Sequence, residues 1–221
     1  MKKLSEHYRN DDLIAIDPEL SRYLDSEYVP TLENLNVENP KILVVFSGGN
    51  ATGKSALASR IAEALDAVVI ENDAIKRAII RKMPDIDKVN ELNPLTWNYS
   101  MDLYSRLANL TNNGLIVRDG VIDWYFDRIL PIFEKAGYKI FIVQYDVSKE
   151  KSTELIRTRG DTPTVTVERL LLLIEDHAIH QKRFRSKYKA DVILDETNVF
   201  DHEKVIDKLK VVVARLNSKK S

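Results

Sequence analysis

The sequence predicts an α/β fold in which helices cover both faces of a five-stranded parallel sheet. Short apolar runs alternate along the chain with segments whose apolar residues recur at helical spacing. The run 42–46 is apolar throughout, as expected of a strand buried on both faces. The segment 48–55, which joins this strand to an amphipathic helix, contains three of the seven glycines of the chain.

The expected strands share an apolar and mostly β-branched character. They are residues 42–46, 67–70, 115–117, 139–144 and 191–194. The expected helices lie between and around them, at residues 19–26, 55–65, 73–82, 98–112, 128–135, 148–159, 167–188 and 202–216.

Helix boundaries follow from apolar spacing and from end signals. In the segment 55–65, apolar residues recur at the three- and four-residue spacing of one helix face, and the last helix repeats this pattern. Gly114 and Gly137 end the helices that precede the third and fourth strands. Ser148 is placed to cap the helix 148–159, and Gly160 is placed to end it.

The composition excludes several kinds of site. The chain has 221 residues, and its 33 Lys and Arg against 34 Asp and Glu give a net charge of −1. This balance disfavours a dedicated nucleic-acid binder, which usually carries a basic excess. The absence of Cys excludes disulfides, thiolate zinc sites and cysteine nucleophiles.

Domain organisation and location follow from the same reading. Residues 1–40 are polar and irregular and are expected to form an N-terminal extension, whereas 41–221 form one domain. The N-terminus lacks the apolar segment of a signal peptide. The longest apolar runs have five residues, against about 20 for a membrane-spanning helix. We therefore expect no membrane association and a cytoplasmic protein.

The segment from Gly48 to Ser55 matches the P-loop pattern of Gly, four free residues, Gly, Lys and Ser or Thr. Its backbone N–H groups and the following helix N-terminus are suited to a triphosphate. Lys54 would contact the β- and γ-phosphates, and the Ser55 hydroxyl would bind Mg²⁺. The predicted nucleotide-binding residues of this loop are Gly48, Gly49, Asn50, Ala51, Thr52, Gly53, Lys54 and Ser55.

Two large classes of P-loop protein are disfavoured. The chain has neither the Asp-x-x-Gly switch motif nor the guanine-reading Asn-Lys-x-Asp motif of GTPases. AAA-type motors are usually longer than this chain, which disfavours that class.

An Asp follows the second strand at position 73, and Arg77 lies one helical turn further on. Here the chain resembles the small P-loop kinases, a group that includes gluconate kinase, shikimate kinase, chloramphenicol phosphotransferase, zeta toxin and polynucleotide kinase. The resemblance covers about residues 41–200 and implies a P-loop NTPase fold, a three-layer sandwich like that of the nucleoside monophosphate kinases.

The resemblance also implies roles for individual residues. Asp73 matches the residue that orients and deprotonates the acceptor hydroxyl, and Arg77 matches a substrate contact. Asp119 ends the third strand and would bind Mg²⁺ or substrate. Arg157 and Arg159 match the arginines of a lid expected around residues 157–165, with Arg157 also contacting nucleotide. Thr197, after the last strand, lies where these kinases bind nucleotide.

The sequence also departs from these families. Ala56 stands where many of them have Thr. Three residues separate Asp73 from Arg77, where some members have two.

The expected activity is ATP- and Mg²⁺-dependent phosphorylation of a hydroxyl on a small molecule or nucleotide. Two alternatives stay open: a polynucleotide 5′-hydroxyl kinase, and a regulatory or zeta-toxin-like ATP-binding module. The polynucleotide alternative would use the basic run 182–189, for which a solvated helix end is the simpler interpretation. Nucleic acid is therefore possible but not favoured as a partner, and the sequence does not indicate the oligomeric state.

Two further sets of side chains have simpler interpretations. His177 and His180 are interpreted as a packed or solvated pair and not as metal ligands. A group of aromatic residues falls near the expected acceptor site, where core packing would explain most of them. They are Trp97, Tyr99, Trp124, Tyr125 and Phe126.

Overall fold

The computed structural model describes residues 15–33, 39–87, 91–110, 114–162 and 165–219. Five strands form one sheet with the order β2-β3-β1-β4-β5, and every neighbouring pair is parallel. The strands are β1 (Ile42–Ser47), β2 (Val68–Glu71), β3 (Leu115–Val121), β4 (Lys139–Asp146) and β5 (Val192–Asp195). The predicted fold class, a five-stranded parallel sheet of the P-loop kinase type, is confirmed.

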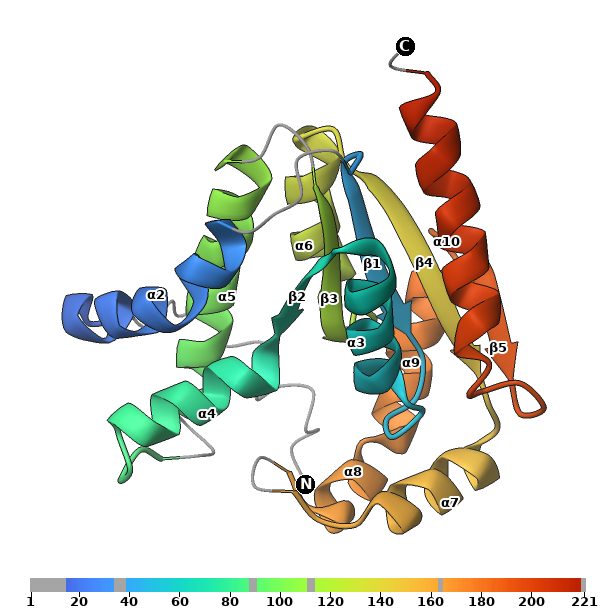
Figure 1. Cartoon of the computed structure of the whole chain (residues 1–221). Helices are drawn as coiled ribbons and strands as arrows, with labels where there is room; N and C mark the ends of the chain where they lie inside the picture. Colours follow the sequence, from blue (N-terminus) through green and yellow to red (C-terminus); the bar gives the residue numbers. More distant parts are fainter. Residues whose placement is uncertain (1–14, 34–38, 88–90, 111–113, 163–164, 220–221) are drawn as a thin grey trace.

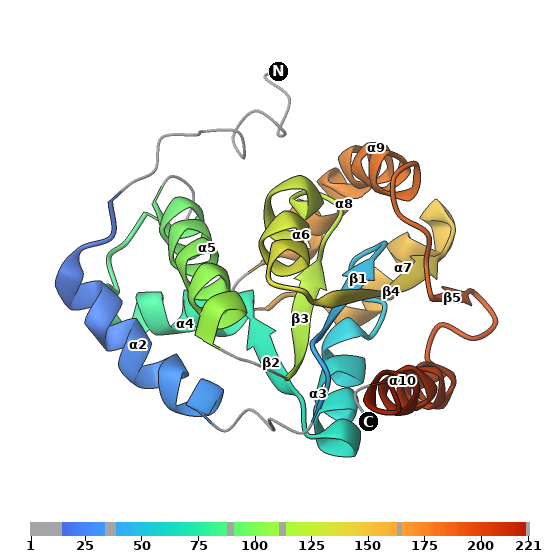
Figure 2. The same ribbon diagram turned by 90° about the horizontal axis from the view of Figure 1, so that it is seen from above.

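Helices pack on both faces of this sheet (Figures 1 and 2). One face carries α3 (Lys54–Leu65) and α10 (His202–Asn217). The other face carries α2 (Pro18–Glu33), α4 (Asn72–Lys82), α5 (Leu92–Leu110), α6 (Phe126–Lys135) and α9 (Ile174–Arg185). Figure 1 shows α7 (Lys149–Arg159) and α8 (Val167–Leu172) across the end of the sheet where β1 opens into the phosphate loop.

The strand β1 explains why the sheet needs two helical layers. Successive side chains of a strand point to opposite faces. Leu43 and Val45 belong to the core under α4, α5 and α6, whereas Ile42, Val44 and Phe46 belong to the core under α3 and α10. All five side chains are fully buried, so the apolar run 42–46 satisfies both layers at once.

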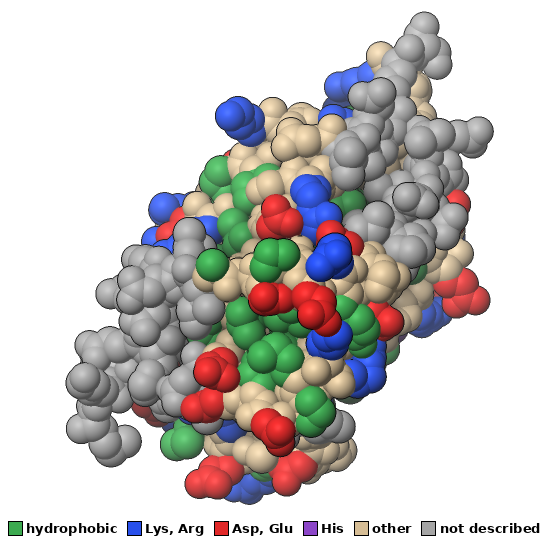
Figure 3. Space-filling model, turned by 90° about the vertical axis from the view of Figure 1, so that its left-hand side faces the viewer, with side chains coloured by type: hydrophobic (Ala, Val, Ile, Leu, Met, Phe, Trp, Pro, Cys, Tyr) green, Lys and Arg blue, Asp and Glu red, His purple; other side chains and the backbone are tan. Residues whose placement is uncertain are grey.

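The helix expected at 19–26 is longer in the structure and packs into the core. Leu20 and Leu24 of α2 are buried against the other helices of their face. Arg81 and Lys82 of α4 form ion pairs with Glu27 and Glu19 of α2. Acidic and basic side chains are interspersed with apolar ones on this side of the molecule (Figure 3). The separate extension 1–40 stays a prediction, and residues 1–14 lie outside the described residues.

The prediction of one long helix at 167–188 is wrong in one respect, because the structure has two helices separated at Leu173. There the backbone N–H of Leu173 bonds to the carbonyl of Leu170, 3.2 Å away, which tightens the turn. The two helices pack in different places. Residues of α8 line a cavity at the sheet edge, while Phe184 of α9 packs in the core.

Two other helices begin earlier than predicted. The helix expected at 98–112 begins at Leu92, because Pro94 falls in its first turn, where no intrahelical N–H bond is lost. The helix expected at 128–135 begins at Phe126. In the part of the chain that the structure describes, no helix combines the length and apolar character needed to cross a membrane.

The packing of α2 leads to a stability prediction. Leu24→Ala should lower the free energy of unfolding by about 2–5 kcal/mol, because Leu24 is fully buried and its truncation leaves a cavity. Leu172→Ala is the matched control, with an expected change within about 0.5 kcal/mol, since Leu172 is 55% exposed. Urea unfolding of both variants measures the difference. A change below about 1 kcal/mol in the free energy of unfolding of Leu24→Ala would show that Leu24 is not packed in the core.

Candidate functional site

The phosphate loop depends on glycine at both of its ends. Gly48 has φ +115°, and a Cβ there would lie 2.3 Å from the backbone oxygen of Tyr145 in β4. Gly53 has φ +83° and stands directly before α3. Any larger residue at Gly48 would therefore be strained and would also displace the loop from β4.

Lys54 is held inside this loop. Its Nζ donates hydrogen bonds to Thr52 Oγ1, 2.9 Å away, and to the carbonyl of Gly49. The ammonium also lies 5.3 Å from the centre of the Tyr145 ring. Burial lowers the pKa of Lys54 from 10.5 to about 8, even though the carboxylates of Asp119 and Asp123 act in the opposite direction.

Asp119 reaches the phosphate loop because β3 is bulged. Val45 of β1 pairs with Arg118, but the next residue, Phe46, pairs with Val121. Asp119 and Gly120 are therefore extra residues on β3, and Asp119 pairs with Glu71 of β2 instead. Burial raises the pKa of Asp119, and hydrogen bonding with the Ser55 hydroxyl opposes that shift. The structure thus brings Ser55 and Asp119 together.

Asp123 also contacts the phosphate loop, although no local motif in the sequence indicates it. Its carboxylate is fully buried, and Oδ2 accepts a hydrogen bond from the backbone N–H of Gly48 at 2.8 Å. The same oxygen lies 3.4 Å from Nε2 of the buried His177. Asp123 therefore fixes the start of the phosphate loop and adds negative charge near Lys54.

One cavity, with a volume of about 1000 Å³, joins the phosphate loop to the side of the sheet near α4 and α5. The loop contributes residues 50–55 to its lining, whereas Gly48 and Gly49 are not lining residues. Asp119 and Asp73 also line the cavity. A nucleotide phosphate chain and a second small molecule can therefore face each other in one space.

Asp73 and Arg77 have different surroundings in the structure. Asp73, in the first turn of α4, lines the cavity, and its Oδ1 lies 3.5 Å from Lys76 Nζ. The Arg77 guanidinium donates instead to Glu71 Oε1 at 2.9 Å and is not part of the cavity lining. Arg77 thus neutralises a carboxylate at the end of β2.

The two predicted lid arginines also separate. Both arginines are exposed, but only Arg159, the last residue of α7, lines the cavity. Arg169 of α8, which the sequence analysis did not select, lines the cavity too. Between these two helices, the Val167 N–H donates a hydrogen bond to Asp161 Oδ1, 2.6 Å away. Residues 163–164 of the predicted lid lie outside the described residues.

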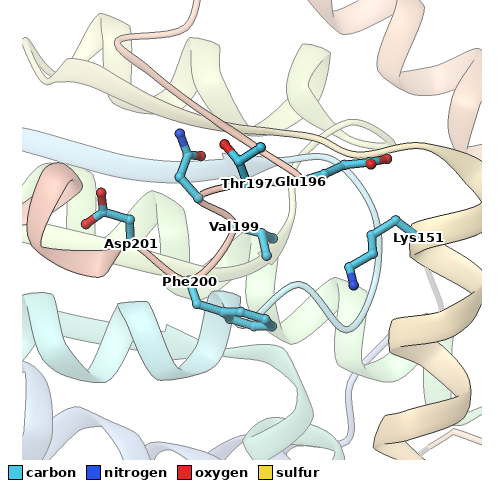
Figure 4. A pocket seen from close by; sticks show the side chains of 7 residues that line it. Lys151, Glu196, Thr197, Val199, Phe200 and Asp201 are labelled. Carbon is cyan, nitrogen blue, oxygen red and sulfur yellow. The ribbon is translucent and has the colours of Figure 1, made fainter.

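Thr197 lines a second, smaller pocket of about 400 Å³ on the other side of the phosphate loop. Figure 4 shows the side chains of Thr197, Phe200 and Lys151 around this pocket. The Thr197 hydroxyl donates to Asp195 Oδ1 at 2.6 Å. Phe200 is 57% exposed, and its ring is the nearest side chain to Gly53. The pocket therefore offers a flat apolar surface next to the phosphate loop.

The aromatic residues divide between cavity and core. Trp97, Trp124 and Tyr125 line the large cavity, and the rings of Trp97 and Tyr125 are 4.2 Å apart. Tyr99 and Phe126 are buried in the core. His177 and His180 lie against Trp124, with His180 stacked on it at 4.0 Å. In the described residues, no cluster of three or more His, Asp or Glu is placed to hold a metal.

The basic run near the end of α9 is engaged by neighbouring side chains. Arg183 pairs with Asp127 at 2.5 Å, and Arg185 pairs with Asp146 at 2.8 Å. Lys187 lies 5.3 Å from the centre of the Phe126 ring. These contacts agree with the simpler interpretation of a compensated helix end.

Comparison with known proteins identifies the family. Residues 43–176, more than half of the chain, match the family model AAA_33, described as an AAA domain. The chain belongs to this family. No sequence among the curated proteins matches. AAA-type motors are usually longer than this chain, and membership of this family does not test whether the chain is one.

Solved structures agree on the fold of this AAA domain. A kinase candidate from Chloroflexus aurantiacus J-10-fl is 16% identical, with 80% of this chain and 98% of that chain covered and a TM-score of 0.56. A tunicamycin resistance protein of Deinococcus radiodurans is 16% identical, with coverage of 78% and 95% and a TM-score of 0.53. A chain of the PezAT toxin–antitoxin system of Streptococcus pneumoniae is 12% identical, with coverage of 84% and 81% and a TM-score of 0.56. The predicted resemblance to the small P-loop kinases is confirmed at the level of the fold.

The lowered pKa of Lys54 predicts a pH dependence of nucleotide affinity. Below pH 8 Lys54 is charged, and above it the free protein loses that charge, so the Kd for ATP should rise by up to tenfold per pH unit. Calorimetric titration with ATP in EDTA, from pH 7.5 to 9.5, measures this rise. Lys54→Met should bind weakly with a flat profile, and Lys208→Met, an exposed control, should follow the wild type. A flat wild-type profile would contradict the assignment.

Proposed function

We propose that the protein is an ATP-dependent phosphotransferase that transfers the γ-phosphoryl group of ATP to a hydroxyl of a small molecule or nucleotide. The observation that carries this proposal is the single cavity shared by the phosphate loop, Asp119 and Asp73. A protein that only bound nucleotide would have no need of a carboxylate on the far side of the phosphates.

The proposed reaction needs alignment and charge neutralisation more than covalent help. The acceptor oxygen forms a bond to the γ-phosphorus while the bond from that phosphorus to the β–γ bridging oxygen breaks, and ADP leaves. Asp73 orients the acceptor hydroxyl and takes its proton. Lys54 and Arg159 neutralise the phosphate oxygens, and Arg169, on the same cavity, is a further candidate for this role.

Ser55 and Asp119 are the proposed ligands of Mg²⁺. A hydroxyl and a carboxylate are hard oxygen donors of the kind Mg²⁺ prefers, and few protein ligands suffice because phosphates and water complete the shell. The buried Asp119 beside Ser55 fits this use, since a cation would compensate a carboxylate whose pKa burial has raised. When bound, Mg²⁺ would draw charge from the β- and γ-phosphates.

Thr197 and Phe200 support a place for the base of the nucleotide. Their pocket lies beside the phosphate loop and is separate from the cavity that contains Asp73. Arg157, which lines neither space, and Arg77, which pairs with Glu71, have less support as direct contacts than Arg159 and Asp73. The polynucleotide kinase alternative has less support too, because Arg183, Arg185 and Lys187 already contact other side chains.

Substitution of Asp73 tests the catalytic proposal. Asp73→Asn should lower kcat by about 10²–10⁴-fold, because the amide cannot accept the proton, while the Kd for ATP stays unchanged. The assay uses radiolabelled ATP and the acceptor found in a panel of sugars, nucleosides, nucleotides, antibiotics and oligonucleotides. Asp207→Asn, an exposed carboxylate on α10, serves as control. Undiminished transfer by Asp73→Asn would rule out its role as base.

Removal of the Phe200 ring tests the pocket for the base. Phe200→Ala should weaken ATP binding by about 1–3 kcal/mol, the usual contribution of one base stacked on an aromatic ring. Binding of tripolyphosphate, which has no base, should stay the same. Calorimetry with both ligands separates the two contributions, and equal losses for both would place the base elsewhere.

A further inference from the structure

Arg118 is a buried cation in the lining of the large cavity. It belongs to β3, is only 2% exposed, and lies opposite Val45 of β1 and Ile70 of β2. Burial of a charge is costly unless an opposite charge compensates it. The hydrogen-bond partners of Arg118 therefore show whether the protein itself compensates this charge.

All of the partners of Arg118 in the described residues are neutral oxygens. Its Nε donates to the Tyr104 hydroxyl at 3.1 Å, and Nη1 donates to the carbonyls of Gly120 and Val121 at 3.1 and 3.2 Å. No described carboxylate forms an ion pair with it, and Nη2 has no hydrogen-bond partner among the described residues. The guanidinium keeps an uncompensated charge and a free donor group at the cavity.

The carboxylates near this part of the cavity have other partners. Glu71 pairs with Arg77 at 2.9 Å, and Asp73 lies 3.5 Å from Lys76. Asp119 lies beside the Ser55 hydroxyl and the Lys54 ammonium, which both lower its pKa. None of these three carboxylates forms an ion pair with Arg118.

A chain of hydrogen bonds links Arg118 to Asn72, the residue that precedes Asp73. The Tyr104 hydroxyl, which accepts from Arg118, donates to Asn72 Oδ1 at 3.1 Å. The Ser100 hydroxyl reaches the same oxygen at 3.3 Å. Asn72 directly precedes Asp73 in α4, so the guanidinium and the proposed base are parts of one connected framework.

We propose that the acceptor carries an anionic group, a carboxylate or a phosphate, which binds Arg118 while its hydroxyl faces Asp73. A guanidinium offers paired donors that match the oxygens of either group. Lys76 provides a second cation in the same lining, which also contains the neighbouring rings of Trp97 and Tyr125. This inference rests on the proposed function, since it names the class of acceptor for the same site.

The competing explanation is that Arg118 only secures the β3 bulge through Gly120 and Val121. Anion binding distinguishes the two, and the chain provides its own probe, because its only two tryptophans, Trp97 and Trp124, both line the cavity. Protein saturated with a non-hydrolysable ATP analogue and Mg²⁺ is titrated with inorganic phosphate and, separately, with acetate. Chloride keeps the ionic strength constant, and the bound analogue blocks the phosphate loop.

We expect a saturable change of tryptophan fluorescence with at least one of the two anions, and the stronger ligand identifies phosphate or carboxylate as the recognised group. Arg118→Met should weaken this binding at least tenfold, and Arg118→Lys should retain part of it. Arg215→Met, an exposed arginine on α10, is the matched control and should bind as the wild type does. No saturable response in the wild type, or an equal one in Arg118→Met, would overturn the proposal.

Two additions keep the test decisive. If Arg118→Met does not fold, Tyr104→Phe replaces it: loss of the hydroxyl that holds Nε should weaken anion binding several-fold, and unchanged affinity would count against the proposal. Transfer is also compared between ribose 5-phosphate and ribose, and between glycerate and glycerol. Transfer favouring the neutral members would refute the anionic acceptor and leave the kinase proposal intact. Absence of ATP binding would refute the kinase proposal itself.

Discussion

The central position of β1 is the constraint on which the site depends. Because β1 is paired on both edges and covered on both faces, its chain can leave the sheet only at the end, where it forms the phosphate loop. The neighbouring strands then deliver their own residues to the same place. Tyr145 of β4 limits Gly48 from one side, and Asp123, just after β3, holds its N–H from the other. The loop is thus shaped by packing before any ligand arrives.

Burial gives this edge of the sheet its chemical character. Lys54 and Asp119 are both removed from water, which lowers the pKa of the lysine and raises that of the carboxyl group. In each case burial disfavours the charged form. Both groups therefore favour ligands of opposite charge, which stabilise the charged form. A phosphate chain suits Lys54, and a divalent cation suits Asp119. Arg118 is buried too, and its hydrogen-bond partners are neutral. In the proposed complex, the anionic group of the acceptor compensates its charge.

Local patterns predicted the sheet and most of its helices, because these depend on apolar spacing and on glycine at helix ends. The phosphate loop was predictable too, because its residues are contiguous in the sequence. Asp123 and Arg118 were not, because their roles depend on partners such as Gly48 and Tyr104, which the fold brings close but the sequence separates. The interruption at Leu173 escaped prediction too, as an apolar run gives no local signal of a break.

The ties between α2 and α5 have a consequence for the size of the folding unit. Asp25 of α2 accepts hydrogen bonds from Tyr99 and Arg106 of α5, at 2.9 and 2.7 Å. The helix that carries Trp97 is therefore held by a carboxylate outside the region shared with the family, residues 43–176. The strand β5 and helix α10 lie outside that region as well. A graft or chimera cut at the limits of sequence similarity would carry over the phosphate loop, but it would lose the supports that hold the opposite side of the cavity in place.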